Sequence, residues 1–255
     1  VVKGYMLANV VFFPDPANVA RRITSTVVFL DTPFLMNVLG YNGKTAAEPC
    51  REMLDLLYEL GGAAACFEHT LAETESILLS CAELVEKGAQ RDVYGPMRGT
   101  FDYFVRSGGT GSDVRLAAAS LEHNLVGKRV KVKAKPPYIP AHVVDEKELE
   151  ATLDTRVTYS RDGQARQRDV DSLSAVHRLR KGRHPIHLED SGALFVTPNV
   201  DLVYASNVFF GRISPQGTVQ VALTNVALTN LLWLKKPLRA PELPRKLIIA
   251  QAFAA

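Results

Sequence analysis

The residues best suited to bind a ligand or take part in a reaction are acids, an amide and hydroxyls. They follow predicted strands or lie in predicted helices. Carboxylates that converge repel one another, so a group of them usually needs a cation. Oxygen ligands without a histidine or cysteine set favour Mg²⁺ or Mn²⁺. Such an ion activates water for the cleavage of a phosphodiester bond. The candidate residues are Asp31, Thr32, Glu73, Asp169, Asp171, Thr197, Asn199 and Asp201.

The elements that must position these residues alternate between strands and helices. Short apolar runs predict buried strands over 26–31, 63–67, 192–197 and 219–223. Apolar residues at helical spacing predict helices over 49–60, 70–88, 112–123, 145–154, 164–181, 201–207, 227–236 and 244–254. The alternation predicts an α/β fold of three layers, α/β/α, with a mostly parallel central sheet. Ligands bind beyond the carboxyl ends of such strands, so we expect the acids to converge there.

The chain of 255 residues is long enough to bury a core without metals or disulfides. We expect one domain over 1–255, with an inserted segment at about 89–163 and closing helices at about 227–254. The chain starts at Val1 in sequence typical of a fold interior, which suggests a piece of a larger protein.

Four segments, in chain order, resemble the motifs of PIN-domain nucleases. They are Val28–Thr32, Phe67–Glu73, Asp169–Val176 and Leu194–Asn199, within a stretch of about 26–225. The resemblance implies a PIN-like fold and an endoribonuclease that uses Mg²⁺ or Mn²⁺ to cleave RNA, or in some members DNA. It also implies that Asp31, Glu73 and Asp171 bind the metal and that Asn199 takes a fourth position. Thr32 would support Asp31 or touch the substrate.

Each of these residues also has a structural interpretation. Asp31 could cap a following helix. Glu73 could complete a capping box with Thr70, and Glu75 competes with it for the ligand role. Asp169 competes with Asp171, which is preferred because the small and apolar residues that follow it match the motif. Asn199 is common in turns, and Asp201 could replace it as a ligand.

A basic segment offers a second candidate feature. Lys128, Arg129, Lys131 and Lys133 alternate with apolar residues, which predicts a strand with one charged face. That face could contact the phosphate backbone of a nucleic acid. It is equally consistent with an edge strand protected by lysines.

Two other functions compete with the nuclease. Pro33 and Asn199 stand where many PIN domains have Asn and Asp, which suggests an inactive PIN-like module that binds nucleic acid or a protein. A phosphotransfer enzyme of the haloacid-dehalogenase type also uses an Asp at the end of its first strand. That family expects a second Asp two residues later, where this chain has Pro33.

Cysteine usage and hydropathy bear on the location of the protein. The three cysteines form no Cys-x-x-Cys pair, which favours the reducing cytoplasm. No run reaches the roughly 18 apolar residues of a membrane span, so no membrane partner is expected. The net charge of +3 permits a polyanionic partner without requiring one. The resemblance to PIN-domain proteins also allows a homodimer, because dimers are common among relatives of this kind.

Overall fold

The computed structural model describes residues 22–88, 97–159 and 163–235. Its centre is a five-stranded sheet in the order β3-β2-β1-β4-β5, and all its pairings are parallel. The strands are β1 (Val27–Leu30), β2 (Ala63–Phe67), β3 (Val130–Lys133), β4 (Ala193–Thr197) and β5 (Ala222–Thr224). The predicted α/β class with a mostly parallel sheet is therefore confirmed.

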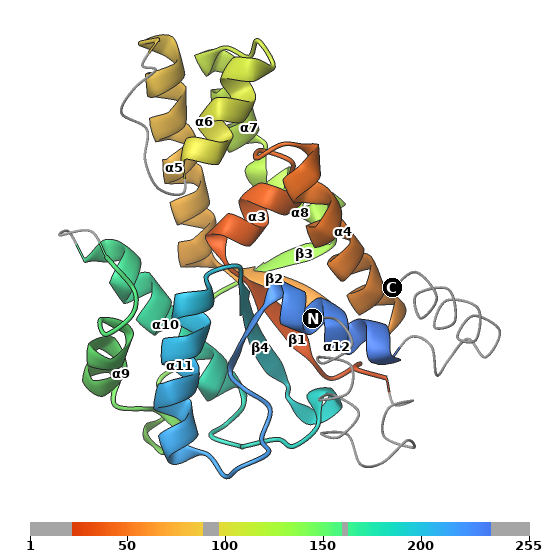
Figure 1. Cartoon of the computed structure of the whole chain (residues 1–255), viewed down its shortest axis with the longest axis vertical. Helices are drawn as coiled ribbons and strands as arrows, with labels where there is room; N and C mark the ends of the chain where they lie inside the picture. Colours follow the sequence, from red (N-terminus) through yellow and green to blue (C-terminus); the bar gives the residue numbers. More distant parts are fainter. Residues whose placement is uncertain (1–21, 89–96, 160–162, 236–255) are drawn as a thin grey trace, which may run out of the picture.

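Helices cover both faces of the sheet, as Figure 1 shows. One face packs against α3 (Thr32–Val38), α4 (Lys44–Glu59), α8 (Leu121–Gly127) and α12 (Asn225–Lys235). The other face packs against α9 (Glu146–Leu153), α10 (Gln164–Leu179) and α11 (Val200–Ile213). The alternation of side chains along β1 explains the two layers, because Val28 and Leu30 enter the first core and Phe29 enters the second.

A third group of helices stands beyond the carboxyl edge of the sheet (Figure 1). It consists of α5 (Glu68–Glu86), α6 (Met97–Arg106) and α7 (Gly111–Ala119), and its small core is built around Leu78, Phe101 and Val114. Two short 3₁₀ turns complete the described chain, at Pro140–His142 and Leu188–Asp190.

Most boundaries lie close to those that the sequence predicts. Two helices, α3 and α6, are absent from the predictions, and α11 runs to Ile213 instead of ending near residue 207. The segment at about 89–163, predicted to be an insertion, supplies β3 to the central sheet. The closing helix predicted over 227–236 corresponds to α12, and the one predicted over 244–254 lies outside the described residues.

None of the helices within the described ranges combines the length and the apolar character needed to cross a membrane. Cys50, Cys66 and Cys81 are buried and form no disulfide. Burial raises the pKa of the Cys66 thiol to about 12, which keeps it protonated and unreactive.

The last described helix is anchored by a buried ion pair. Lys235, at the end of α12, pairs with Glu189 from the turn before β4, and both side chains are at most 5% exposed. Removing one partner would leave the other charge buried and uncompensated.

We expect Lys235→Met to lower the free energy of unfolding by about 3–5 kcal/mol, because Glu189 is left charged in the interior. The double variant Lys235→Met/Glu189→Gln should recover much of that loss. Urea unfolding followed by circular dichroism measures both. The exposed pair Lys87–Glu83 gives the control, since Lys87→Met should change stability by less than about 1 kcal/mol. If the single and double variants lose the same free energy of unfolding, Lys235 and Glu189 do not form a buried ion pair that stabilises the fold.

Candidate active site

The carboxyl edge between β1 and β4 is the topological switch point of the sheet. The strand order reverses there, and the chain leaves β1 toward α3 on one face and β4 toward α11 on the other. Open α/β sheets form a ligand-binding crevice at this position. Asp31 follows β1 and Thr197 ends β4, and the Thr197 hydroxyl donates a hydrogen bond of 2.6 Å to Asp31 Oδ2.

Asp31 is held as a desolvated carboxylate. Its Oδ1 accepts a hydrogen bond of 2.8 Å from the backbone N–H of Thr32, so it caps α3. Burial is the main cause that raises the pKa of Asp31 to about 6. The hydrogen bond from Thr197 lowers this pKa, the charge of Glu73 raises it, and the bond from Thr32 lowers it again. The helix-cap interpretation of Asp31 therefore holds, and the side chain also faces other acids.

Glu73 lies in α5 and is connected to Asp31 through Thr32. The Thr32 hydroxyl donates a hydrogen bond of 2.6 Å to Glu73 Oε2, and Arg168 Nη1 donates one of 2.9 Å to Glu73 Oε1. The capping-box interpretation of Glu73 is wrong. The helix begins at Glu68 with Phe67 as its N-cap, so Thr70 lies inside it.

Asp169 joins this group from α10. Burial is the largest cause that raises the pKa of Asp169 well above its ordinary value, and the charges of Asp31 and Glu73 raise it further. The Tyr159 hydroxyl donates a hydrogen bond of 2.8 Å to Asp169 Oδ2, which acts in the opposite direction. Asp31, Glu73 and Asp169 thus form the acidic group of the carboxyl edge.

Asp171, the ligand preferred from the motif, lies on another side of α10. Two residues turn a helix by about 200°, so Asp169 and Asp171 cannot share a direction. Asp171 forms an ion pair of 2.6 Å with Lys135 and accepts a hydrogen bond of 3.1 Å from Gln167. Asp31 and Glu73 are not among the groups that shift the pKa of Asp171. The structure therefore brings Asp169, and not Asp171, together with the other two acids.

Asn199 and Asp201 both have structural roles at the start of α11. Asn199 is the N-cap of α11, because its Oδ1 accepts a hydrogen bond of 3.1 Å from the N–H of Leu202. Its own N–H donates to the Thr197 hydroxyl at 3.0 Å, which couples the cap to Asp31 through Thr197. Asp201 is exposed in the first turn of α11, where an acid favours the helix dipole.

A stacked column fixes the helices that carry Glu73 and Asp169. Phe29 stacks on Phe67 with ring centroids 4.3 Å apart, and Phe67 stacks on His69 at 5.3 Å. The His69 Nε2 lies 2.8 Å from the Ser172 hydroxyl of α10. The column therefore ties α5 and α10 to the sheet, which sets the distance between the two acids.

The basic residues divide between two sides of the sheet edge. Lys131 and Lys133 are exposed on β3, the strand that the alternation predicts, which lies at the edge of the sheet. Lys133 shares a sheet face with Phe29, with its Nζ 5.9 Å from that ring, so it lies on the side of Asp169. Arg129 instead stacks over Tyr58 on α4 at 3.9 Å, and Lys128 ends α8.

The donor chemistry of the acidic group fits a hard divalent cation, since it consists of carboxylates: the charge of Glu73 raises the pKa of Asp31, and the charges of Asp31 and Glu73 raise that of Asp169. Within the described part of the chain, however, no three or more His, Cys, Asp or Glu side chains stand in a geometry that could hold a metal ion. Each carboxylate is held instead by a hydroxyl, and Glu73 also by the Arg168 guanidinium. No local pattern points to Arg168 or Tyr159, because only the fold brings these residues to the acids.

Comparisons with family models, with curated protein sequences and with solved structures found no significant match. The α/β architecture by itself supports many unrelated activities. A function is therefore inferred from the acidic group and its surroundings.

The raised pKa of Asp31 predicts a pH-dependent stability. A carboxyl group whose pKa is higher in the folded than in the unfolded state binds more protons when folded, between pH about 4 and 6. Its cost to stability is therefore full above pH 6 and disappears as the pH falls toward 4. We expect Asp31→Asn to raise the free energy of unfolding by about 1–3 kcal/mol at pH 7.5 and by much less at pH 4.5.

Urea titrations of both proteins at the two pH values measure this difference, and the comparison at each pH cancels the titration of other groups. The exposed Asp201→Asn is the matched control and should change stability little at either pH. If Asp31→Asn destabilises the protein equally at both pH values, the carboxylate is not strained by burial.

Proposed function

We propose that this protein is a metal-dependent, PIN-like endoribonuclease in which Asp31, Glu73 and Asp169 close around Mg²⁺ or Mn²⁺ when the ion binds, since among the described residues these side chains do not stand in a metal-holding geometry without it. The observation that carries the proposal is the convergence of three carboxylates at the carboxyl edge, where Thr197, Thr32 and Tyr159 each bind one of them, and burial with neighbouring charges raises the pKa of Asp31 and of Asp169. Protein interiors rarely retain such a group without a use for it. A bound divalent cation would supply the positive charge that the group lacks and a water activated for phosphodiester hydrolysis.

The residues around the acids support this chemistry by orienting them. Thr197, Thr32 and Tyr159 each donate a hydrogen bond to one of the three carboxylates, so the acids keep defined directions. Arg168 has a side chain that is 31% exposed and lies against Glu73, and in the proposed reaction its guanidinium would bind a substrate phosphate. RNA as the substrate follows from the motif resemblance, and DNA is an alternative outcome of the same assays.

The order of the strands supports the same location for the reaction. The switch point lies beside β1 and β4, so a polynucleotide at the carboxyl edge would pass between the acids and the lysines of β3. Lys131 and Lys133 would bind backbone phosphates next to the cleavage position. Lys128 and Arg129, predicted to share this role, contact the side of α4 and α8 and are assigned no part in it.

One observation favours a second candidate, an inactive PIN-like module that binds nucleic acid. The Arg168 guanidinium already pairs with Glu73 at 2.9 Å, and a built-in cation at that place can replace a metal ion. Asn199, the expected fourth ligand, uses its side-chain oxygen as a helix cap. Calorimetric titration with Mn²⁺ separates the two candidates, because the module would bind RNA without binding the metal.

We expect cleavage of single-stranded RNA that requires Mg²⁺ or Mn²⁺ and that falls by about 10²–10⁴-fold in Asp31→Asn and in Asp169→Asn, because each variant removes a ligand. Asp171→Asn is the matched control on the same helix. It should retain most of the activity, since Asp171 pairs with Lys135. Fluorescent oligonucleotides resolved on denaturing gels provide the measurement. Full activity in Asp31→Asn would contradict the nuclease proposal. Loss of activity in Asp171→Asn with retained activity in Asp169→Asn would assign the ligand role to Asp171 instead of Asp169.

A second expectation concerns the lysines of β3 and holds for both candidates. Lys131→Gln/Lys133→Gln should weaken RNA binding and reduce the slope of log K against log salt by about 1.4, at about 0.7 for each lost phosphate contact. Fluorescence anisotropy at several salt concentrations measures the slope. Lys87, at the end of α5, and Lys147, in α9, are exposed lysines outside β3. The control variant Lys87→Gln/Lys147→Gln should therefore bind RNA as the parent does. If Lys131→Gln/Lys133→Gln leaves the slope of log K against log salt unchanged, the two lysines do not contact RNA and only protect the edge of the sheet.

A further inference from the structure

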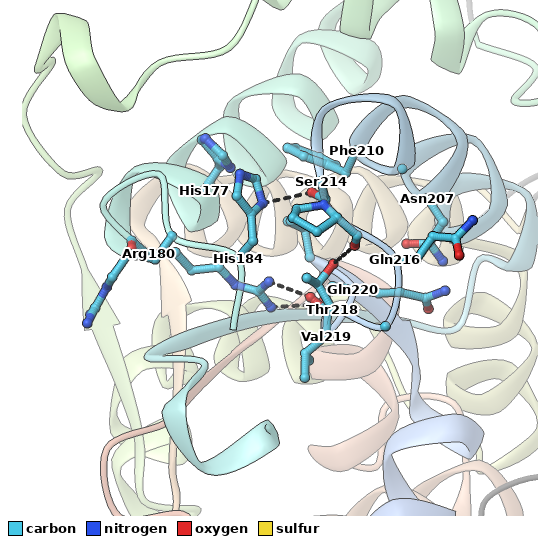
Figure 2. A pocket seen from close by; sticks show the side chains of 15 residues that line it. His177, Arg180, His184, Asn207, Phe210, Ser214, Gln216, Thr218, Val219 and Gln220 are labelled. Atoms are coloured by element: carbon cyan, nitrogen blue, oxygen red, sulfur yellow. Dashed lines mark hydrogen bonds between the residues drawn. The ribbon is translucent and has the colours of Figure 1, made fainter. Parts of the chain in front are cut away.

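A cavity of about 210 Å³ lies at the amino edge of the sheet, at the end of β4 opposite to Asp31. Figure 2 shows it between the end of α10, the second half of α11 and the loop that leads to β5. Four basic residues line it, namely His177, Arg180, Arg183 and His184, and its lining contains no aspartate or glutamate. The five residues of β4 separate it from the acidic group by about 13 Å along the strand.

Arg180 brings a buried positive charge to this cavity. It is 2% exposed, and its Nε, Nη1 and Nη2 donate to the carbonyl oxygens of Ala193, Val219 and Gln220 at 2.7–2.8 Å. Burial lowers the pKa of Arg180 to about 10, so the guanidinium is still charged at neutral pH. Within residues 22–88, 97–159 and 163–235, no carboxylate pairs with it. Carbonyl dipoles satisfy its donors but do not cancel its charge.

Two further groups leave hydrogen-bonding capacity unused beside Arg180. His177 is 6% exposed, and its ring contacts Phe210 and His184 without a hydrogen bond to any described residue. The Oδ1 of Asn207 is buried without a partner, and exchanging the ends of this amide would place its NH₂ donor there. The Ser214 hydroxyl lies 2.8 Å from His184 Nδ1, which fixes the orientation of that ring (Figure 2).

The positive surroundings also contribute to a lowered pKa of His177. Burial is the main cause that lowers the pKa of His177 to about 4, and the charges of His184, Arg180 and His142 lower it further. A cavity that is walled by donors and cations and has no carboxylate favours an anion. Its volume exceeds that of a single phosphate and is below the usual range for drug-sized ligands, about 300–1,000 Å³.

We propose that this cavity binds a small oxyanion, either free phosphate or the phosphoryl group of a small sugar phosphate. The anion would neutralise the field of Arg180 and accept hydrogen bonds from Arg183, His184 and the Asn207 amide. The site is separate from the acidic group and does not depend on the nuclease proposal, because it uses none of the same residues.

Titration with inorganic phosphate, with EDTA present and ionic strength held constant with chloride, tests the site. Long-range ¹H–¹⁵N spectra of the histidine rings are the readout, with signals assigned from His177→Gln and His184→Gln. We expect saturable shifts of the His177 and His184 signals, and the same shifts in Asp31→Asn. Ribose 5-phosphate that binds more tightly than phosphate would identify a sugar phosphate as the ligand, and equal affinities would identify the free anion.

The exposed Arg183 allows a variant that should fold normally. Arg183→Gln should weaken phosphate binding at least tenfold, whereas Arg212→Gln, an exposed arginine of α11 that pairs with Glu148, should bind as the parent does. The proposal is overturned if no histidine signal shifts saturably, if all histidines shift alike, or if Arg183→Gln binds phosphate as tightly as the parent.

Discussion

Asp31, Glu73 and Asp169 carry like charges to the carboxyl edge of the sheet, where burial removes much of the water around Asp31 and Asp169, and their repulsion must be offset by the side chains around them. Three hydroxyls and one guanidinium perform that task, each by donating a hydrogen bond to a carboxylate. This solution compensates only part of the negative charge. The carboxyl edge therefore remains the place where a cation, whether a metal ion or Arg168, has the most to stabilise.

The rest of the fold holds these charges in place. The side chains of β1 alternate between two apolar cores, so the strand that delivers Asp31 is packed on both faces. The stacked column from Phe29 to His69 continues by a hydrogen bond to Ser172, which joins α5 to α10. Repulsion between Glu73 and Asp169 thus acts against a packed core, which has little freedom to relax.

Helix α10 connects two sites of opposite charge. Asp169 in its first half belongs to the acidic carboxyl edge, and His177 and Arg180 at its end belong to the basic amino edge. Cations near the carboxyl end of a helix also favour its dipole, so the basic residues have a structural reason to be there. Arg180 donates to the carbonyl of Ala193 in β4 and to the carbonyls of Val219 and Gln220 in the segment before β5, so its side chain also links β4 to that segment.

The sequence by itself determined the layers and the position of the site. Apolar runs of four or five residues and helical spacing are local patterns, so they fixed the strands and most helices, and an acid after the first strand fixed the edge where chemistry could occur. The tertiary structure decided which acid of α10 joins that edge. The motif favours Asp171 over Asp169, and only the packing of α10 against the sheet turns Asp169 toward Asp31 and leaves Asp171 to Lys135. The positions of Arg168, Tyr159 and the Arg180 guanidinium also depend on contacts between separate segments of the chain, and no local pattern records such contacts.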